Sequence, residues 1–205
     1  MPHDIRQPPD LRRLSRSGWA GIHLQSRAFD QHGLIPPCYR RDGGNDSPDL
    51  RWSGLPSGTC ELLLLVEDPD DPRRTVLHWL VTGIDPACTG VAAGETPKNG
   101  RVWCNDFGDL GYGGPQQPAD NASHRYLFWL FALASPARLP RHPNAADVHR
   151  AIRDTVVASG VLVGRYPRQR RARPKLIDPI RHATRRRVDG GSGSSRAGFT
   201  VGLLR

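Results

Sequence analysis

Two apolar segments separated by an acidic turn stand out in the hydrophobic pattern of this 205-residue chain. Residues 61–66 and 75–84 are rich in Leu, Val and Trp, and such runs are typical of strands buried in a sheet. A third run at 125–133 (RYLFWLFAL) is apolar on both faces, so we expect it to lie centrally. The pattern therefore predicts a mainly β fold built around these three strands.

Shorter strands and loops surround them. Gly- and Pro-rich loops are expected at 42–48 and 108–121. Four further short strands are expected at 21–24 (with Trp19), 50–52, 102–107 and 161–166.

The sequence predicts one helix, at 145–159. Asn144 can cap its first turn together with Asp147, and Gly160 can close it. Three apolar residues recur at i, i+4 and i+8 and should face the sheet: Val148, Ile152 and Val156.

The excess positive charge lies in the C-terminal tail. The chain has 29 Lys and Arg against 20 Asp and Glu, and residues 168–205 hold 11 and 2 of these, leaving 18 of each sign for residues 1–167. The neutral part gives no electrostatic case for a nucleic-acid partner. After Pro167 apolar residues are too sparse to offset the entropy of ordering. We therefore expect a loose lead-in at 1–18, one domain at 19–167 and a disordered basic tail at 168–205.

The cysteines and the apolar stretches limit the class of protein. The four cysteines are widely spaced, without a CxxC pair or a His at metal spacing, which argues against zinc. Disulfides and reduced thiols both fit their even number. Residues 1–18 lack the apolar stretch of a secretory signal, and the longest apolar run, 126–134, is far below the ~20 residues of a membrane helix. We expect a soluble, cytoplasmic protein without a cofactor.

Polar side chains occur at the ends of the apolar strands. The turn after the first strand carries Asp68 and Asp70, and the second strand carries His78. The third strand begins with His124 and Tyr126, which alternation places on one face. Each alone is most often a turn or a hydrogen-bonded core residue. Together they favour a pocket for a small anion, in which the carboxylates hold both imidazoles protonated and oriented.

A glycine-rich loop at 111–115 (GYGGP) precedes His124. Its glycines allow backbone amides to approach a ligand closely. We expect this loop to form part of the binding site through Tyr112, Gly114 and Pro115.

An ordered set of short motifs spans residues 26–166. The motifs are Gly44-Asn45-Asp46-Ser47-Pro48, Arg51-Trp52-Ser53-Gly54, Asp68-Pro69-Asp70 with Pro72, His78-Trp79, Asn105-Asp106-Phe107-Gly108, Gly111-Tyr112-Gly113-Gly114-Pro115, His124-Arg125-Tyr126, and Leu162-Val163-Gly164 with Tyr166. In this order the set resembles the phosphatidylethanolamine-binding protein (Raf kinase inhibitor-like) family, especially its bacterial branch.

The resemblance implies a large central β-sheet, a smaller second sheet and one or two helices. It also implies an anion pocket, here at Asp68, Asp70, His78, Gly114, Pro115, His124 and Tyr126. Family members bind phosphate-like head groups or phosphorylated side chains, and several inhibit kinases or proteases. The expected partner is a small anionic ligand (phosphate or a phospho-head group), with a protein target of inhibition and a homodimer as further candidates.

The chain departs from the family pattern at three places. Residues 116–118 (QQP) replace a Cys-Pro-Pro-like lip. Asp71 replaces a usual Ala and would weaken anion binding if its charge points inward. The basic tail stands where eukaryotic relatives have a C-terminal helix.

Three other functions are compatible with the sequence. A hydrolase would use His124 or His78 as a general base, although the sequence has no nucleophile elbow. The tail could bind nucleic acid or anionic lipid, although it lacks interleaved aromatic residues for stacking. A metal would suit Asp68, Asp70, His78 and His124 by residue type. Their spacing does not require one, so we expect no metal.

Overall fold

The computed structural model describes residues 21–116 and 122–166, and the structural statements below concern these ranges. They belong to one compact unit, Met1–Arg170. The expected lead-in at 1–18, Trp19 and the basic tail at 168–205 lie outside the described residues. The elements are β1 (His23–Gln25), β2 (Gly33–Leu34), the 3₁₀ turn η1 (Pro37–Tyr39), β3 (Leu50–Ser53), β4 (Glu61–Asp68), β5 (Val76–Ile84), β6 (Gly90–Val91), β7 (Arg101–Val102), β8 (His124–Leu133), α2 (Ala145–Ile152) and β9 (Val156–Tyr166).

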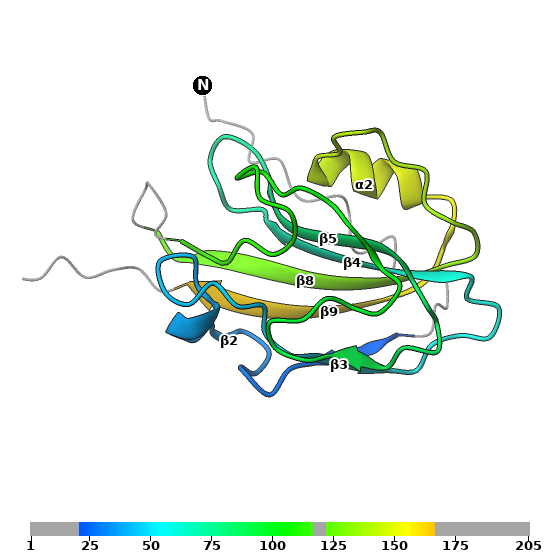
Figure 1. Ribbon diagram of the computed structural model, residues 1–205, viewed down its shortest axis with the longest axis horizontal. Coiled ribbons are helices and arrows are strands. Elements are labelled where there is room, and N and C mark those ends of the chain that lie inside the picture. Colours follow the sequence, from blue (N-terminus) through cyan, green and yellow to red (C-terminus); the bar gives the residue numbers. More distant parts are fainter. Residues whose placement is uncertain (1–20, 117–121, 167–205) are drawn as a thin grey trace, which may run out of the picture. The chain divides into compact units, whose positions relative to one another are not determined.

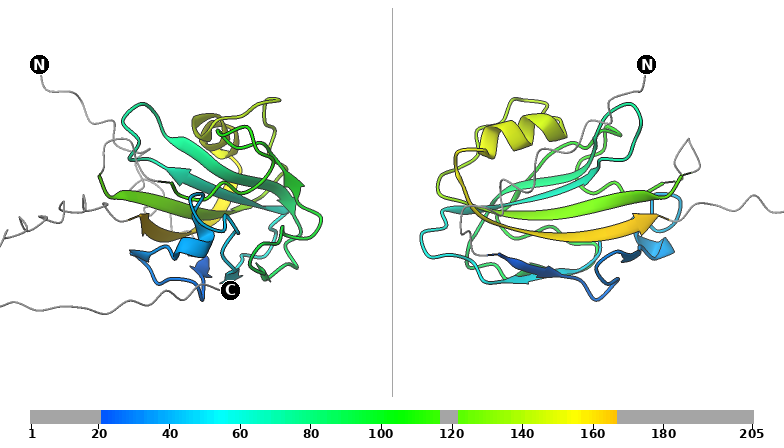
Figure 2. Two further views of the ribbon diagram at one scale, coloured as in Figure 1. Left: turned by 60° about the vertical axis from the view of Figure 1, so that its left-hand side comes forward. Right: turned by 180° about the vertical axis from the view of Figure 1, so that it is seen from behind.

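Two sheets make up the fold, as the family resemblance implied. The large sheet has the order β2-β9-β8-β4-β5-β7, and the small sheet has the order β1-β3-β6. The large sheet lies between α2 on one side and the small sheet on the other (Figures 1 and 2). Strand β8 pairs with both β4 and β9, which confirms the prediction that the run at 125–133 is central.

The alternation of side chains along β4 divides the core into two layers. Leu62, Leu64 and Val66 pack in the layer that also holds Trp52 of the small sheet. Leu63 and Leu65 pack in the opposite layer, which includes residues of α2. Because successive residues of a strand point to opposite faces, an apolar run that is covered on both sides buries every residue.

The predicted helix at 145–159 is wrong in its second half. Helix α2 begins as expected, because Asn144 and Asp147 form a reciprocal capping box, but it ends at Ile152. The Thr155 amide donates to the Ile152 carbonyl oxygen at 2.9 Å, and β9 starts at Val156, opposite Leu133. Two adjacent valines at 156 and 157 favour a strand, since β-branched side chains suit a pleated sheet.

Gly160 therefore lies within β9, opposite Leu130, and does not close a helix. A Cβ atom there would lie closer than 3.0 Å to the Ile22 carbonyl oxygen. The glycine allows the chain around residue 22 to approach β9, where the Ile22 amide donates to the Ser159 carbonyl oxygen at 3.1 Å.

The predicted strand at 102–107 is also mostly absent. Strand β7 covers only Arg101–Val102. The Asn105 carboxamide oxygen then accepts from the amides of Phe107 and Asp109, at 2.9 and 3.1 Å. Asn commonly bonds its own following backbone in this way, and the chain turns as a result.

Two further expectations concern the cysteines and the membrane. All four cysteines are free thiols. Within the described ranges, no helix combines the length and the apolar character that crossing a bilayer requires.

Candidate functional site

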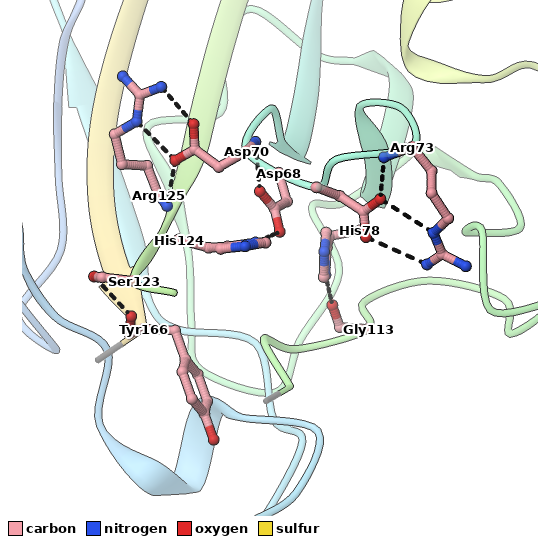
Figure 3. Close-up of polar contacts among 10 residues, drawn as sticks. Asp68, Asp70, Arg73, His78, Gly113, Ser123, His124, Arg125 and Tyr166 are labelled. Atoms are coloured by element: carbon pink, nitrogen blue, oxygen red, sulfur yellow. Dashed lines mark hydrogen bonds and ion pairs between the residues drawn. The ribbon is translucent and has the colours of Figure 1, made fainter. Parts of the chain in front are cut away.

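The site forms where the last residues of β4 meet the first residues of β8. These strands are antiparallel and pair down to Glu67 and Leu127, so Asp68 lies beside the start of β8. Strand β5 is the other neighbour of β4 and brings in His78. Figure 3 shows Asp68 in contact with His124 and, close by, His78 with its own backbone partner.

A cavity of about 390 Å³ opens at this place. Its volume lies in the range of small-molecule sites. The lining residues are Asp68, Asp71, Arg73, Arg74, Val76, His78, Asp106, Phe107, Gln116, His124 and Tyr126. Four of the eight predicted site residues are thus brought together on the cavity wall: Asp68, His78, His124 and Tyr126.

Asp68 is the centre of the polar network. One of its carboxylate oxygens lies 2.7 Å from His124 Nδ1, and the other accepts from the Asp70 amide at 2.8 Å. Burial raises the pKa of Asp68, although the hydrogen bond with His124 opposes this. Burial and the neighbouring Asp68 charge raise the pKa of Tyr126.

His78 differs from the expectation of a protonated imidazole. Its side chain is buried, and Nδ1 lies 2.6 Å from the Gly113 carbonyl oxygen. Burial lowers the pKa of His78 to about 4, although the bond to Gly113 opposes the shift. The rings of Phe107 and Tyr126 pack edge-on, with centroids 5.1 and 5.0 Å from that of His78. The desolvation of the charged form therefore decides, and the ring is neutral at pH 7.

Asp70 does not hold an imidazole. Its two carboxylate oxygens accept from Arg125 Nε and Nη2 at 2.8 and 2.6 Å, and the Arg125 amide adds a third bond at 2.9 Å (Figure 3). Burial would raise the pKa of Asp70, but the bonds from Arg125 outweigh it and the pKa lies below its ordinary value. Asp70 thus joins the β4–β5 turn to β8 and does not line the cavity.

The glycine-rich loop lies behind the cavity wall. The Tyr112 hydroxyl donates to the Tyr39 carbonyl oxygen at 2.9 Å, and the Gly114 amide donates to the Asn45 side chain at 2.7 Å. The Pro115 carbonyl oxygen accepts from the Arg41 amide at 2.8 Å. Tyr112, Gly114 and Pro115 therefore position the loop whose Gly113 carbonyl contacts His78, and they are not themselves lining residues.

Two arginines on the β4–β5 turn were missed as site residues. Arg73 contacts both oxygens of Asp71, each at 3.3 Å, and Arg74 Nη1 lies 2.8 Å from Asp106 Oδ2. Burial would raise the pKa of Asp71, but the bonds from Arg73 outweigh it and the pKa lies below its ordinary value. In the sequence, the Arg-Arg pair directly after the acidic turn is equally typical of an ordinary charged turn. The carboxylate of Asp71, which departs from the family pattern, does line the cavity, but it is paired with the guanidinium group of Arg73.

Metal ligation finds no support in this geometry. Across residues 21–116 and 122–166, no three His, Cys, Asp or Glu side chains are grouped to hold a metal ion.

Comparison with known proteins identifies the family. The family model described as phosphatidylethanolamine-binding protein matches residues 25–167. The chain belongs to this family. A UPF0098 protein of Methanothermobacter thermautotrophicus is 37% identical over 152 residues, which are 72% of this chain and 99% of the relative.

Solved bacterial structures of the family share the fold. A phosphatidylethanolamine-binding protein homologue of Chlamydia trachomatis has a TM-score of 0.65 at 30% identity, covering 73% of this chain and 99% of its own. Escherichia coli YbcL, a member of the mammalian family by its description, has a TM-score of 0.67 at 26% identity, covering 73% and 100%. The resemblance inferred from the motifs at 26–166 is thus confirmed.

Proposed function

We propose that this protein binds a small phosphate-like anion in the cavity and does not turn it over. The observation that carries the proposal is the meeting of two arginines, two histidines and Tyr126 on one cavity of about 390 Å³. Guanidinium groups are well suited to phosphoryl oxygens, which they bind through two parallel N–H groups.

The arginines are available to a ligand because their side chains are largely exposed, although the paired carboxylates of Asp71 and Asp106 are only 17% and 15% exposed. The side chains of Arg73 and Arg74 are 83% and 54% exposed. Exchanging a carboxylate for a ligand oxygen keeps each guanidinium group paired with a negative charge. The carboxylates of Asp71 and Asp106 would hold the guanidinium groups at the cavity until an anion replaces them.

Binding without turnover is favoured by the side chains on the wall. Among the described lining residues none is Ser, Thr or Cys, so a covalent route through one of these three nucleophiles has no candidate there. Ser123, next to His124 in the chain, donates its hydroxyl to the Tyr166 carbonyl oxygen at 3.0 Å. A role as a kinase or protease inhibitor rests on the family resemblance and belongs to the same proposal.

Isothermal titration with inorganic phosphate tests the proposal. We expect saturable binding to the full chain, and a loss of at least about tenfold in affinity for the Arg73→Ala, Arg74→Ala double variant. Arg150→Ala is the matched control, since Arg150 also pairs with an Asp but lies on α2, across the sheet. Absence of binding to the unmodified chain would refute the proposal. Release of phosphate from esters that is lost in His124→Ala would replace binding with hydrolysis.

A further inference from the structure

The hydrogen-bond polarity of the cavity wall follows from one short contact. His78 Nδ1 lies 2.6 Å from the Gly113 carbonyl oxygen (Figure 3). A carbonyl oxygen only accepts, so Nδ1 carries the proton and donates. In a neutral imidazole with Nδ1 protonated, Nε2 holds a lone pair and accepts.

Nε2 of His78 borders the cavity. His78 is a lining residue. Among the described residues, Trp79 Nε1 is the one fully buried side-chain nitrogen or oxygen without a hydrogen-bond partner. The second nitrogen of His78 is therefore not sealed in the core. It presents a hydrogen-bond acceptor to whatever occupies the cavity.

The charged and aromatic groups around His78 leave Nε2 as a hydrogen-bond acceptor. Tyr126 of β8 contacts the His78 ring edge-on, with the ring centroids 5.0 Å apart. The charges of Asp106, after β7, and of Arg41, before β3, act on the ring in opposite directions.

The remaining wall also contains acceptors. Asp68, Asp71 and Asp106 contribute three carboxylates, beside the two guanidinium groups of Arg73 and Arg74, the His124 ring and the Tyr126 hydroxyl. An anion whose oxygens all lack protons would meet the His78 lone pair and three carboxyl groups without a donor for any of them. An anion that keeps one proton has a donor for this side of the cavity and charged oxygens for the arginines.

We propose that the cavity selects an oxyanion that still carries a proton, a hydrogen-phosphate group whose P–OH donates to His78 Nε2. This inference rests on the proposed function and specifies its ligand. Inorganic phosphate retains a P–OH at neutral and mildly alkaline pH. A phosphomonoester loses its last proton with a pKa of about 6. Sulfate carries no proton in this range.

Titrations with three probes at two pH values test the selection. At pH 8 we expect inorganic phosphate to bind at least about tenfold more tightly than sulfate, because sulfate leaves a buried acceptor unpaired. Methyl phosphate should resemble sulfate at pH 8 and inorganic phosphate at pH 5.5. Sulfate at both pH values controls for other titrating groups.

The outcomes separate the two proposals. Equal affinity for sulfate and phosphate overturns the selection but leaves anion binding intact, and so does methyl phosphate that equals inorganic phosphate at pH 8. Failure of all three probes to bind removes both proposals. Methyl phosphate that binds at neither pH, with phosphate still preferred over sulfate, identifies free phosphate as the ligand.

The tautomer can be read directly from the unmodified protein. Long-range ¹H–¹⁵N spectra should show Nδ1 protonated and Nε2 bare at pH 7, with the Nε2 signal moving on addition of phosphate. A proton on Nε2 in the free protein overturns the inference.

A substitution provides the second test. His78→Asn keeps a donor for Gly113 and removes Nε2, so the preference for phosphate over sulfate should fall to about onefold to threefold. His32→Asn is the control, because His32 is exposed and its φ of 63° is one that Asn tolerates. An unchanged preference in folded His78→Asn contradicts the inference.

Discussion

Replacing Gly160 by Ala should destabilise the fold by a predictable amount. A Cβ atom at this position meets the Ile22 backbone carbonyl, which cannot rotate away, so the segment must move off β9. The movement removes the Ile22–Ser159 hydrogen bond, about 1 kcal/mol, and exposes part of the buried Ile22 side chain, worth about 1.5–3 kcal/mol in full. The lower backbone entropy of Ala returns about 0.5–1 kcal/mol. The net loss is about 2 kcal/mol.

Thermal unfolding measures this loss. For a domain of this size, about 2 kcal/mol lowers Tm by about 5–8 °C. Gly21→Ala is the matched control, since a Cβ atom there has nothing within 4 Å, and it should change stability by less than about 0.5 kcal/mol. If both variants melt together, the close approach of residue 22 to β9 is wrong.

Three further predictions concern the site. Because burial lowers the pKa of His78 to about 4 from an ordinary 6.5, the unfolded chain binds more protons between these values, and stability present above pH 6.5 is lost as the pH falls toward 4. The loss is about 3 kcal/mol in denaturant unfolding and should be absent in His78→Asn. Asp71→Ala should tighten phosphate binding about two- to fivefold in calorimetry, because it frees Arg73; weaker binding would contradict the exchange of partners. Asp70→Ala should cost about 1 kcal/mol of stability by breaking the half-exposed pair with Arg125, with unchanged phosphate affinity; a large loss of affinity would place Asp70 in the cavity.

Much of the fold could be predicted from the sequence because three apolar runs are covered on both faces. The run that became β8 left no alternative to a central strand. The end of α2 could not be predicted in the same way. Position 156 continues the i, i+4 spacing of Val148 and Ile152, and in β9, opposite Leu133, it packs in the same core layer as they do. Only the pairing with Leu133 in the sheet distinguishes a strand at position 156 from a continued helix.

The candidate site could also be predicted only in part. Asp68, His78, His124 and Tyr126 could be grouped because they end or begin neighbouring strands. The sequence could not show that Asp70, two residues beyond Asp68, faces Arg125. It also gave no reason to separate Arg73 and Arg74 from an ordinary charged turn. Their role depends on their pairing with Asp71 and Asp106, which also line the cavity.

The central claim is that one cavity brings Arg73, Arg74, His78 and His124 to a small anion. The most direct test follows the ring signals of both histidines by NMR while inorganic phosphate is added at pH 7. The account predicts that both sets of signals move together and saturate at one dissociation constant, while those of the exposed His32 stay in place. Signals of His78 and His124 that do not move at any phosphate concentration would contradict it.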